Sequence, residues 1–197
     1  MKTNTLLSVI AATLCGTAIG LSGCSRDVTQ DARVTPAVPT HPPGSTELHA
    51  VAQLTPTEGN SVRGTVRFST EGEAVRVVAE ITGLTPGDHG FHVHETGDCS
   101  APDASSAGGH FNPTQQSHGA RDASSRHVGD LGNLTADATG RAQLSYLDPM
   151  LRLSGGNSIV GRAVIVHAGR DDLTSQPSGD SGARVACGMI EMERKNL

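Results

Sequence analysis

The chain has 197 residues, which is enough for one domain with a hydrophobic core and short for two. Hydrophobic residues make up 36% of it, while 24 glycines and 10 prolines favour short strands and turns over long helices. A formal net charge of -5 argues against nucleic acid as a partner. Composition therefore predicts an all-β protein that does not bind nucleic acid.

The first residues have the layout of an export signal. Lys2 precedes an apolar run that is short for a membrane-spanning helix, and small residues follow it. The end of this run, Leu21-Ser22-Gly23-Cys24, resembles the lipobox of bacterial lipoproteins, in which the cysteine is acylated and the peptide is cut just before it. We therefore expect residues 1–23 to be a lipoprotein signal peptide and Cys24 to be lipidated. An ordinary signal peptide that happens to contain Cys24 is the alternative.

A tether is expected next. Residues 25–46 are polar with a Pro/Thr-rich patch and show no apolar periodicity, so residues 24–46 are expected to be flexible. Ser25, rather than Asp, follows the cysteine, and the resemblance to Gram-negative lipoproteins then favours the outer membrane over the inner one. The predicted location is the outer membrane, with the chain anchored through the lipid on Cys24 and facing the periplasm.

The sequence has four cysteines, of which two remain available for a disulfide in the mature chain. Cys15 is discarded with the signal peptide and Cys24 is blocked by lipid, which leaves Cys99 and Cys187. Two thiols in an oxidising compartment suggest one disulfide. The chain-entropy model gives such a long loop an upper limit of about 4 to 5 kcal/mol of stabilisation. Two unpaired buried cysteines are the alternative.

The rest of the chain, residues 47–197, shows short segments of period two separated by turn residues, which predicts half-buried antiparallel strands. The segments "ELHAVAQLTP", "SVRGTVRFS" and "AVRVVAEITGL" each place apolar residues on one face. Further strands are expected at residues 89–95, 131–137, 141–147, 159–167 and 184–192. Eight strands fit a Greek-key sandwich or flattened barrel.

Two intervals do not have the pattern of strands, residues 96–127 and residues 168–183. Loops of this length in a compact domain usually carry function. Beside the first loop, His92 and His94 lie two apart on a predicted strand, so their side chains share one face while Phe91 and Val93 share the other. An HxH pair alone is weak support for a metal site. The hypothesis of a metal site is strengthened by further potential ligands in and beside the two loops, which are His110, His118, His127, Asp130 and His167.

Six blocks, "GFHVHETGDC", "GGHFNP", "SHG", "RHVGDLGNLTAD", "GRAVIVHAGRDDL" and "RVACGMI", resemble the signature blocks of the copper/zinc superoxide dismutase family, over about residues 47–194. The resemblance implies disproportionation of superoxide to dioxygen and hydrogen peroxide at a copper centre that one bridging histidine couples to zinc. It implies that copper is held by His92, His94, His110 and His167. It implies that zinc is held by His110, His118, His127 and Asp130. Four imidazoles suit Cu(II), and three imidazoles with one carboxylate suit Zn(II).

The resemblance extends to residues around the metals. Asp171 matches a carboxylate that accepts hydrogen bonds from one ligand of each metal, here His92 and His118. Arg184 matches the arginine that receives the substrate anion, a role that suits a permanently charged fork. His110 is then catalytic as well as a ligand, because the resemblance implies that it takes up and delivers a proton. His89, which is not a ligand, is given only a structural hydrogen-bonding role.

The sequence departs from many relatives in its second long loop. The interval from Asp171 to Arg184 lacks the lysine and glutamates of the animal enzymes' steering loop and offers Asp172 and Asp180 instead. The candidates for steering the anion are then Arg121, Arg126 and Arg170, and weak steering is the alternative.

Two other functions are compatible with parts of the pattern. One is a surface lipoprotein that binds copper and zinc without turnover, against which the complete set of ligands and the arginine argue. The other is a β-sandwich adhesion module with incidental histidines. The sequence does not decide the oligomeric state, and a homodimer is one option.

Overall fold

The computed structural model describes residues 47–194, so the predicted signal peptide and the tether with Cys24 lie outside the described residues. The elements in chain order are β1 (His49–Pro56), β2 (Arg63–Glu71), β3 (Ala74–Thr82), β4 (Gly87–His94), the 3-10 turn η1 (Ser105–Ala107), β5 (Asp130–Ala136), β6 (Ala142–Asp148), β7 (Ala163–His167) and β8 (Arg184–Met192). Within the described part of the chain no helix is long and apolar enough to span a membrane.

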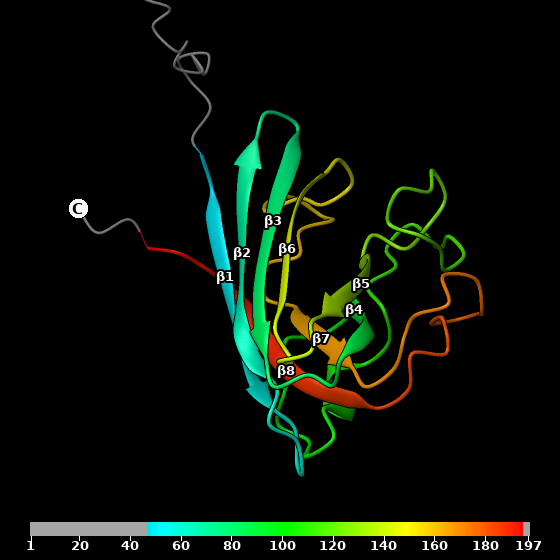
Figure 1. The fold of residues 1–197 in the computed structure, drawn as a ribbon. Helices are drawn as coiled ribbons and strands as arrows, with labels where there is room; N and C mark the ends of the chain where they lie inside the picture. The colour runs from blue at the N-terminus through cyan, green and yellow to red at the C-terminus, as the bar shows by residue number, and fades with distance from the viewer. Residues whose placement is uncertain (1–46, 195–197) are drawn as a thin grey trace, which may run out of the picture. The chain divides into compact units, whose positions relative to one another are not determined.

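The eight strands form one antiparallel sheet in the order β5-β4-β7-β8-β1-β2-β3-β6 (Figure 1). Its two edge strands, β5 and β6, follow one another in the chain, and the sheet curls into a nearly closed barrel. Connections that skip neighbours, such as β3 to β4 and β6 to β7, give the Greek-key character. The predicted all-β fold with eight strands is confirmed.

Alternating side chains explain why these segments form strands around a common core. On β3, Val75, Val77, Ala79 and Ile81 are buried, whereas Glu80 on the opposite face is exposed. The predicted apolar faces of β1 and β2 are buried in the same cluster. Because the core is contributed by every strand, the barrel is a rigid support for the segments that leave its ends.

The strand predicted at residues 159–167 is too long. β7 begins only at Ala163, since Gly161 has a φ of 81° and the chain turns there. Ile159 instead donates its N–H to the carbonyl of Arg152 within the preceding loop, at 2.9 Å. The apolar run therefore contains a buried loop residue followed by a short strand, which periodicity alone does not separate.

The two long loops predicted from sequence connect β4 to β5, at residues 95–129, and β7 to β8, at residues 168–183. They lie on the same side of the barrel, drawn in green and orange in Figure 1. A disulfide joins Cys99 in the first loop to Cys187 on β8, as predicted, with the two Cα atoms 5.8 Å apart. This bond fixes the first loop against the strand that begins at Arg184.

Candidate metal centre

Strand β4 places two imidazoles on the face away from the core. Phe91 and Val93 are fully buried in the barrel core, so His92 and His94 point the opposite way. β7 pairs with β4 and ends at His167, and a β-bridge brings His110 of the first loop beside His94. The pleat, the strand pairing and one bridge thus bring these four histidines together.

The four histidines form the first of two groups of potential metal ligands, with one donor atom from each lying within 4.8 Å of the others. In all four the other ring nitrogen is hydrogen-bonded, in His110 to Asp130. His94 Nδ1 bonds to the carbonyl of Gly108 at 2.9 Å, His167 Nδ1 to that of Gly182 at 2.9 Å, and His92 Nε2 to Asp171 at 2.7 Å. Such bonds fix the tautomer, so the free nitrogen of each ring is directed at the shared centre.

The remaining nitrogens of this group are buried and have no hydrogen-bond partner. They are His92 Nδ1, His94 Nε2, His110 Nε2 and His167 Nε2. Leaving one buried polar atom unsatisfied typically costs about 1 to 3 kcal/mol, so four at one point require an explanation. A transition-metal cation supplies one, because neutral imidazole is a ligand that copper and zinc share. The residues present therefore fit a metal at this point.

The second group gathers around one carboxylate oxygen. Asp130 Oδ1 lies 2.9 Å from His110 Nδ1, 3.0 Å from His118 Nδ1 and 3.3 Å from His127 Nδ1. The other oxygen of Asp130 accepts the backbone N–H groups of Gly119, at 3.1 Å, and His127, at 2.8 Å. Three imidazoles and one carboxylate, all buried, are a donor set that suits tetrahedral zinc.

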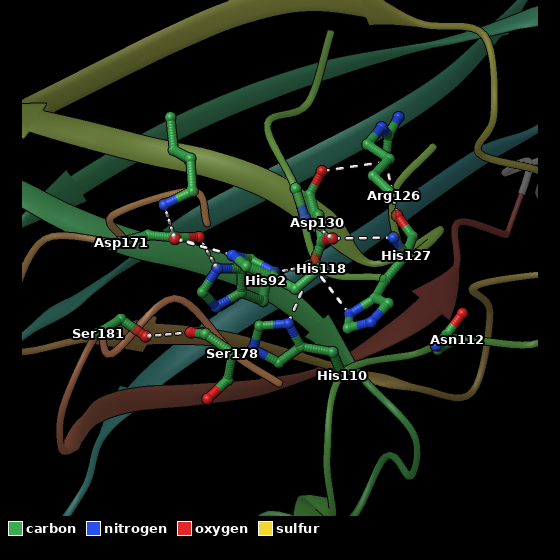
Figure 2. Close-up of polar contacts among 12 residues, drawn as sticks. His92, His110, Asn112, His118, Arg126, His127, Asp130, Asp171, Ser178 and Ser181 are labelled. Atoms are coloured by element: carbon green, nitrogen blue, oxygen red, sulfur yellow. Dashed lines mark hydrogen bonds and ion pairs between the residues drawn. The ribbon is translucent and has the colours of Figure 1, made fainter. Parts of the chain in front are cut away.

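His110 belongs to both groups. Its Nδ1 faces Asp130, whereas its Nε2 faces the four-histidine group, and its ring centroid lies 4.0 Å from that of His92. Figure 2 shows His110, His118 and His127 gathered around Asp130. The two ring nitrogens of one imidazole thus point at two adjacent cation positions.

Asp171 connects the groups a second time. One of its carboxylate oxygens lies 2.7 Å from His92 Nε2 and the other 2.9 Å from His118 Nε2, and the side chains of all three residues are buried (Figure 2). The structure therefore places Asp171, and not its exposed neighbour Asp172, between the two groups.

Burial sets the charge states of these side chains. It lowers the pKa of His94 to about 2 and that of His167 to about 3, so both rings are neutral at neutral pH and offer a lone pair. Burial also disfavours the charged form of His118, but the hydrogen bonds to Asp130 and Asp171 outweigh it and raise the pKa to about 9. The metal-free second group therefore holds a protonated imidazole at the point where the donor set would accept a cation.

Arg184 lies at the open side of the first group. Its Nη1 and Nη2 donate to the carbonyls of Ala104 and Gly108, both at 2.6 Å, and the Gly108 carbonyl also bonds His94. The guanidinium borders a pocket of about 540 Å³ that His94, His110, His127 and His167 also line. A pocket of this size does not fit closely around a small anion, so charge rather than shape would select what binds there.

Arg126 was a candidate for steering, and this prediction is wrong. Its side chain is fully buried, where it pairs with Asp148 at 2.7 Å and donates to the carbonyls of His127, Val128 and Asp130. Arg126 therefore holds the segment that carries two ligands of the second group. The other two candidates do not line the pocket, since Arg121 stacks on Tyr146 and Arg170 lies 3.7 Å from Asp88.

Sequence reasoning found Asp171 but missed the other groups that orient the ligands. The carbonyls of Gly108 and Gly182 are backbone atoms, so no residue type marks them. The only sequence clue to Arg126 was its position next to His127, and position in the chain does not reveal burial.

His89 has the structural hydrogen-bonding role that was expected. Its ring bonds to the carbonyls of His167 and Thr85, both at 2.8 Å.

Comparison with known proteins agrees with this geometry. Residues 62–190 match the family model for copper/zinc superoxide dismutase (SODC). The chain is 47% identical to "Superoxide dismutase [Cu-Zn]" of Onchocerca volvulus over 153 residues, which cover 72% of this chain and 94% of the relative. It is 45% identical to "Superoxide dismutase [Cu-Zn]" of Paramecium bursaria Chlorella virus 1 over 143 residues, which cover 69% and 76%.

The chain belongs to the copper/zinc superoxide dismutase family. The two donor groups, one of four imidazoles and one of three imidazoles with a carboxylate, fit the two metals of a copper/zinc superoxide dismutase.

Proposed function

We propose that this protein disproportionates superoxide, with copper held by His92, His94, His110 and His167 and zinc held by His110, His118, His127 and Asp130. The observation that carries the proposal is the double role of His110, whose two ring nitrogens face the two donor groups while Arg184 borders the same pocket. Two superoxide anions and two protons give one dioxygen and one hydrogen peroxide. Bound copper supplies one-electron redox chemistry, and bound zinc supplies a fixed positive charge.

The protein's own residues bind the anion and supply one of the protons. The Arg184 guanidinium attracts superoxide into the pocket, and its position relative to His94 is fixed because both bond to the Gly108 carbonyl. His110 Nε2, which has no hydrogen-bond partner among residues 47–194, would hold a proton when it is not bound to the metal and would pass that proton to the reduced substrate. The Nδ1 atom of His110 remains directed at Asp130, so the ring returns to the same orientation after each turnover.

Activity of the purified, copper- and zinc-reconstituted chain tests the proposal, with free copper at the same concentration as the reference. Arg184→Ala should lower kcat/KM while both metals stay bound, because the arginine is not a ligand. His110→Ala should lower activity and also change the ligand set of copper, which the electron paramagnetic resonance spectrum of copper reports. Wild-type activity no higher than that of free copper would refute the proposed function.

The location is a separate proposal that rests on the sequence of residues 1–46 alone. Lipid on Cys24 would anchor the protein to the outer membrane with the enzyme domain in the periplasm. Cys24→Ser, expressed in a Gram-negative host, should then move the protein from the membrane fraction to the soluble periplasmic fraction. If wild type and variant fractionate alike, Cys24 is not an anchor. A homodimer also stays a prediction, which sedimentation of the purified protein can test.

A further inference from the structure

The bond between His118 and Asp171 has a side-chain amide at each of its ends. Asn133 of β5 forms two hydrogen bonds with the backbone of Asp171, donating to its carbonyl at 2.9 Å and accepting its N–H at 2.8 Å. Gln176 forms the equivalent pair with the backbone of His118, accepting its N–H at 2.8 Å and donating to its carbonyl at 3.0 Å. The backbones of His118 and Asp171 are therefore each held by a side chain that belongs to neither donor group.

The two amides differ in what they join. Asn133 holds Asp171 to a strand of the barrel, which is rigid. Gln176 belongs to the loop at residues 168–183 and holds a residue of the other long loop, at residues 95–129. Among residues 47–194, the hydrogen bonds that join these two loops directly all end on His118, from the side chains of Gln176 and Asp171. One residue of the second donor group is therefore the junction between the loops.

The second loop also packs closely on this junction. A Cβ atom on Gly179 would lie 2.7 Å from His118 Nε2 and 2.6 Å from Asp171 Cγ, so only a glycine lets the loop come this near. Gly179 in turn donates its N–H to the carbonyl of Ser175, at 2.7 Å, next to Gln176 in the chain. Fixing Gln176 against His118 therefore also fixes the backbone that covers the bond between His118 and Asp171.

We propose that Gln176 is a positioning residue that latches the loop at residues 168–183 onto His118 and so slows the loss of zinc. The inference rests on the assignment of zinc to the second donor group. Gln176 bonds both the backbone N–H and the backbone carbonyl of His118. The imidazole ring therefore keeps Nδ1 toward Asp130 and Nε2 toward Asp171. Without the two hydrogen bonds from Gln176 the backbone of residue 118 fluctuates more. The His118 ring then leaves the metal more often.

The test compares zinc release by the copper- and zinc-loaded full chain with that of Gln176→Met and Gln176→Ala, using a chromophoric chelator in excess. Methionine keeps the length of the side chain and removes both hydrogen bonds. The expected acceleration is about three- to tenfold, below the effect usual for a partner that bonds a ligand directly. Amide hydrogen exchange should rise at residue 118 and across residues 168–183.

Ser175→Ala is the matched control, because among residues 47–194 the Ser175 hydroxyl bonds only to Asp172 of its own loop. The proposal is overturned if Gln176→Met releases zinc at the wild-type rate, or if Ser175→Ala accelerates release as much. Zinc release tests the role of Gln176, and dismutase activity tests the proposed function. A wild type that binds zinc but has no dismutase activity contradicts the proposed function and leaves the comparison of zinc release intact. A wild type that binds no zinc contradicts both.

Discussion

Asp171 and Asp172 are adjacent carboxylates with opposite surroundings. Asp171 is buried between two imidazoles of different donor groups, whereas Asp172 is exposed and bonds the backbone of Thr174 and Ser175 in its own loop. Asp171→Asn keeps the shape but loses the charge and one acceptor oxygen, so one of the two rings, His92 or His118, loses its partner. We expect zinc affinity to fall about 10- to 100-fold, the effect usual for a partner that bonds a metal ligand.

Competition with a zinc chelator measures that affinity, and Asp172→Asn is the control with the same chemical change one residue away. Equal zinc affinity in Asp171→Asn and wild type would mean that the carboxylate does not orient the ligands. A similar loss in both variants would mean that loop charge, rather than the contact with the rings, is responsible.

The pocket beside Arg184 also contains acidic side chains. Glu95 and Asp180 line it with the arginine, and both are exposed. A negative charge at the mouth repels superoxide, so Asp180→Asn should raise kcat/KM about two- to threefold at low ionic strength, and the gain should shrink as salt is added. Asp180 has a φ of 50°, a conformation that asparagine tolerates, so the substitution leaves the backbone unstrained.

Asp122→Asn controls for the change in net charge, because Asp122 is exposed and does not line this pocket. If Asp122→Asn raises kcat/KM by the same factor, the whole-molecule charge governs the encounter. If neither variant responds to salt, exposed charges play no part in steering.

At the scale of elements, the loop at residues 168–183 depends on one glycine for its close approach to the site. Gly179→Ala forces a Cβ into the Asp171 carboxylate and also places a side chain at a φ of 69°. The loop must move outward, which breaks the bonds it makes to His118. We expect faster zinc loss than in Gln176→Met. The strain of alanine at a positive φ should by itself lower the free energy of unfolding by about 1 kcal/mol.

Gly155→Ala separates these two effects. Gly155 has a φ of 80°, and a Cβ atom added there would meet nothing within 4 Å, so the substitution introduces the backbone strain without the overlap. Thermal unfolding of the metal-free variants should show the larger loss in Gly179→Ala, where the overlap adds to the strain, and zinc release should accelerate only in Gly179→Ala. Unchanged zinc release in Gly179→Ala would show that the loop does not need this contact.

Local patterns in the sequence predicted the strands and the order of the ligand-bearing segments. Alternation along β1 to β3 shows directly which face packs in the barrel core, and the pair His92 and His94 shows which face of β4 is turned away from that core. Apart from those of Asp171, the contacts that orient the ligands involve backbone carbonyls and amides distant in sequence, such as Gln176 with His118, and no local pattern encodes them. For the same reason the burial of Arg126 could not be predicted from its residue type.

Considered as a whole molecule, the two donor groups differ in how much of their support the barrel supplies. Three members of the first group, His92, His94 and His167, lie on β4 and β7, which the sheet orders without metal. The second group takes three of its four members from the loop at residues 95–129, and only Asp130 begins a strand. With zinc in the second group and copper in the first, as proposed, zinc would close a long loop, whereas copper would bind between strands that are already fixed.

This difference predicts unequal effects of the two metals on the metal-free protein. Zinc alone should restore most of the amide protection across residues 95–129. Copper alone should protect mainly the region around His110, the one member of its group that comes from the loop. For either metal, a free concentration 1,000-fold above Kd adds about 4.1 kcal/mol to the free energy of unfolding, so both metals are compared at that same ratio.

Hydrogen exchange and calorimetry of the metal-free, zinc-loaded and copper-loaded protein measure this, with the Cys99–Cys187 disulfide kept oxidised because it restrains the same loop. The reduced protein should show a still larger difference between the metals, since zinc then remains the main restraint on residues 95–129. Equal protection of the loop by copper alone would contradict the argument. It would mean that His110, through its bridge to His94, is enough to order the whole segment.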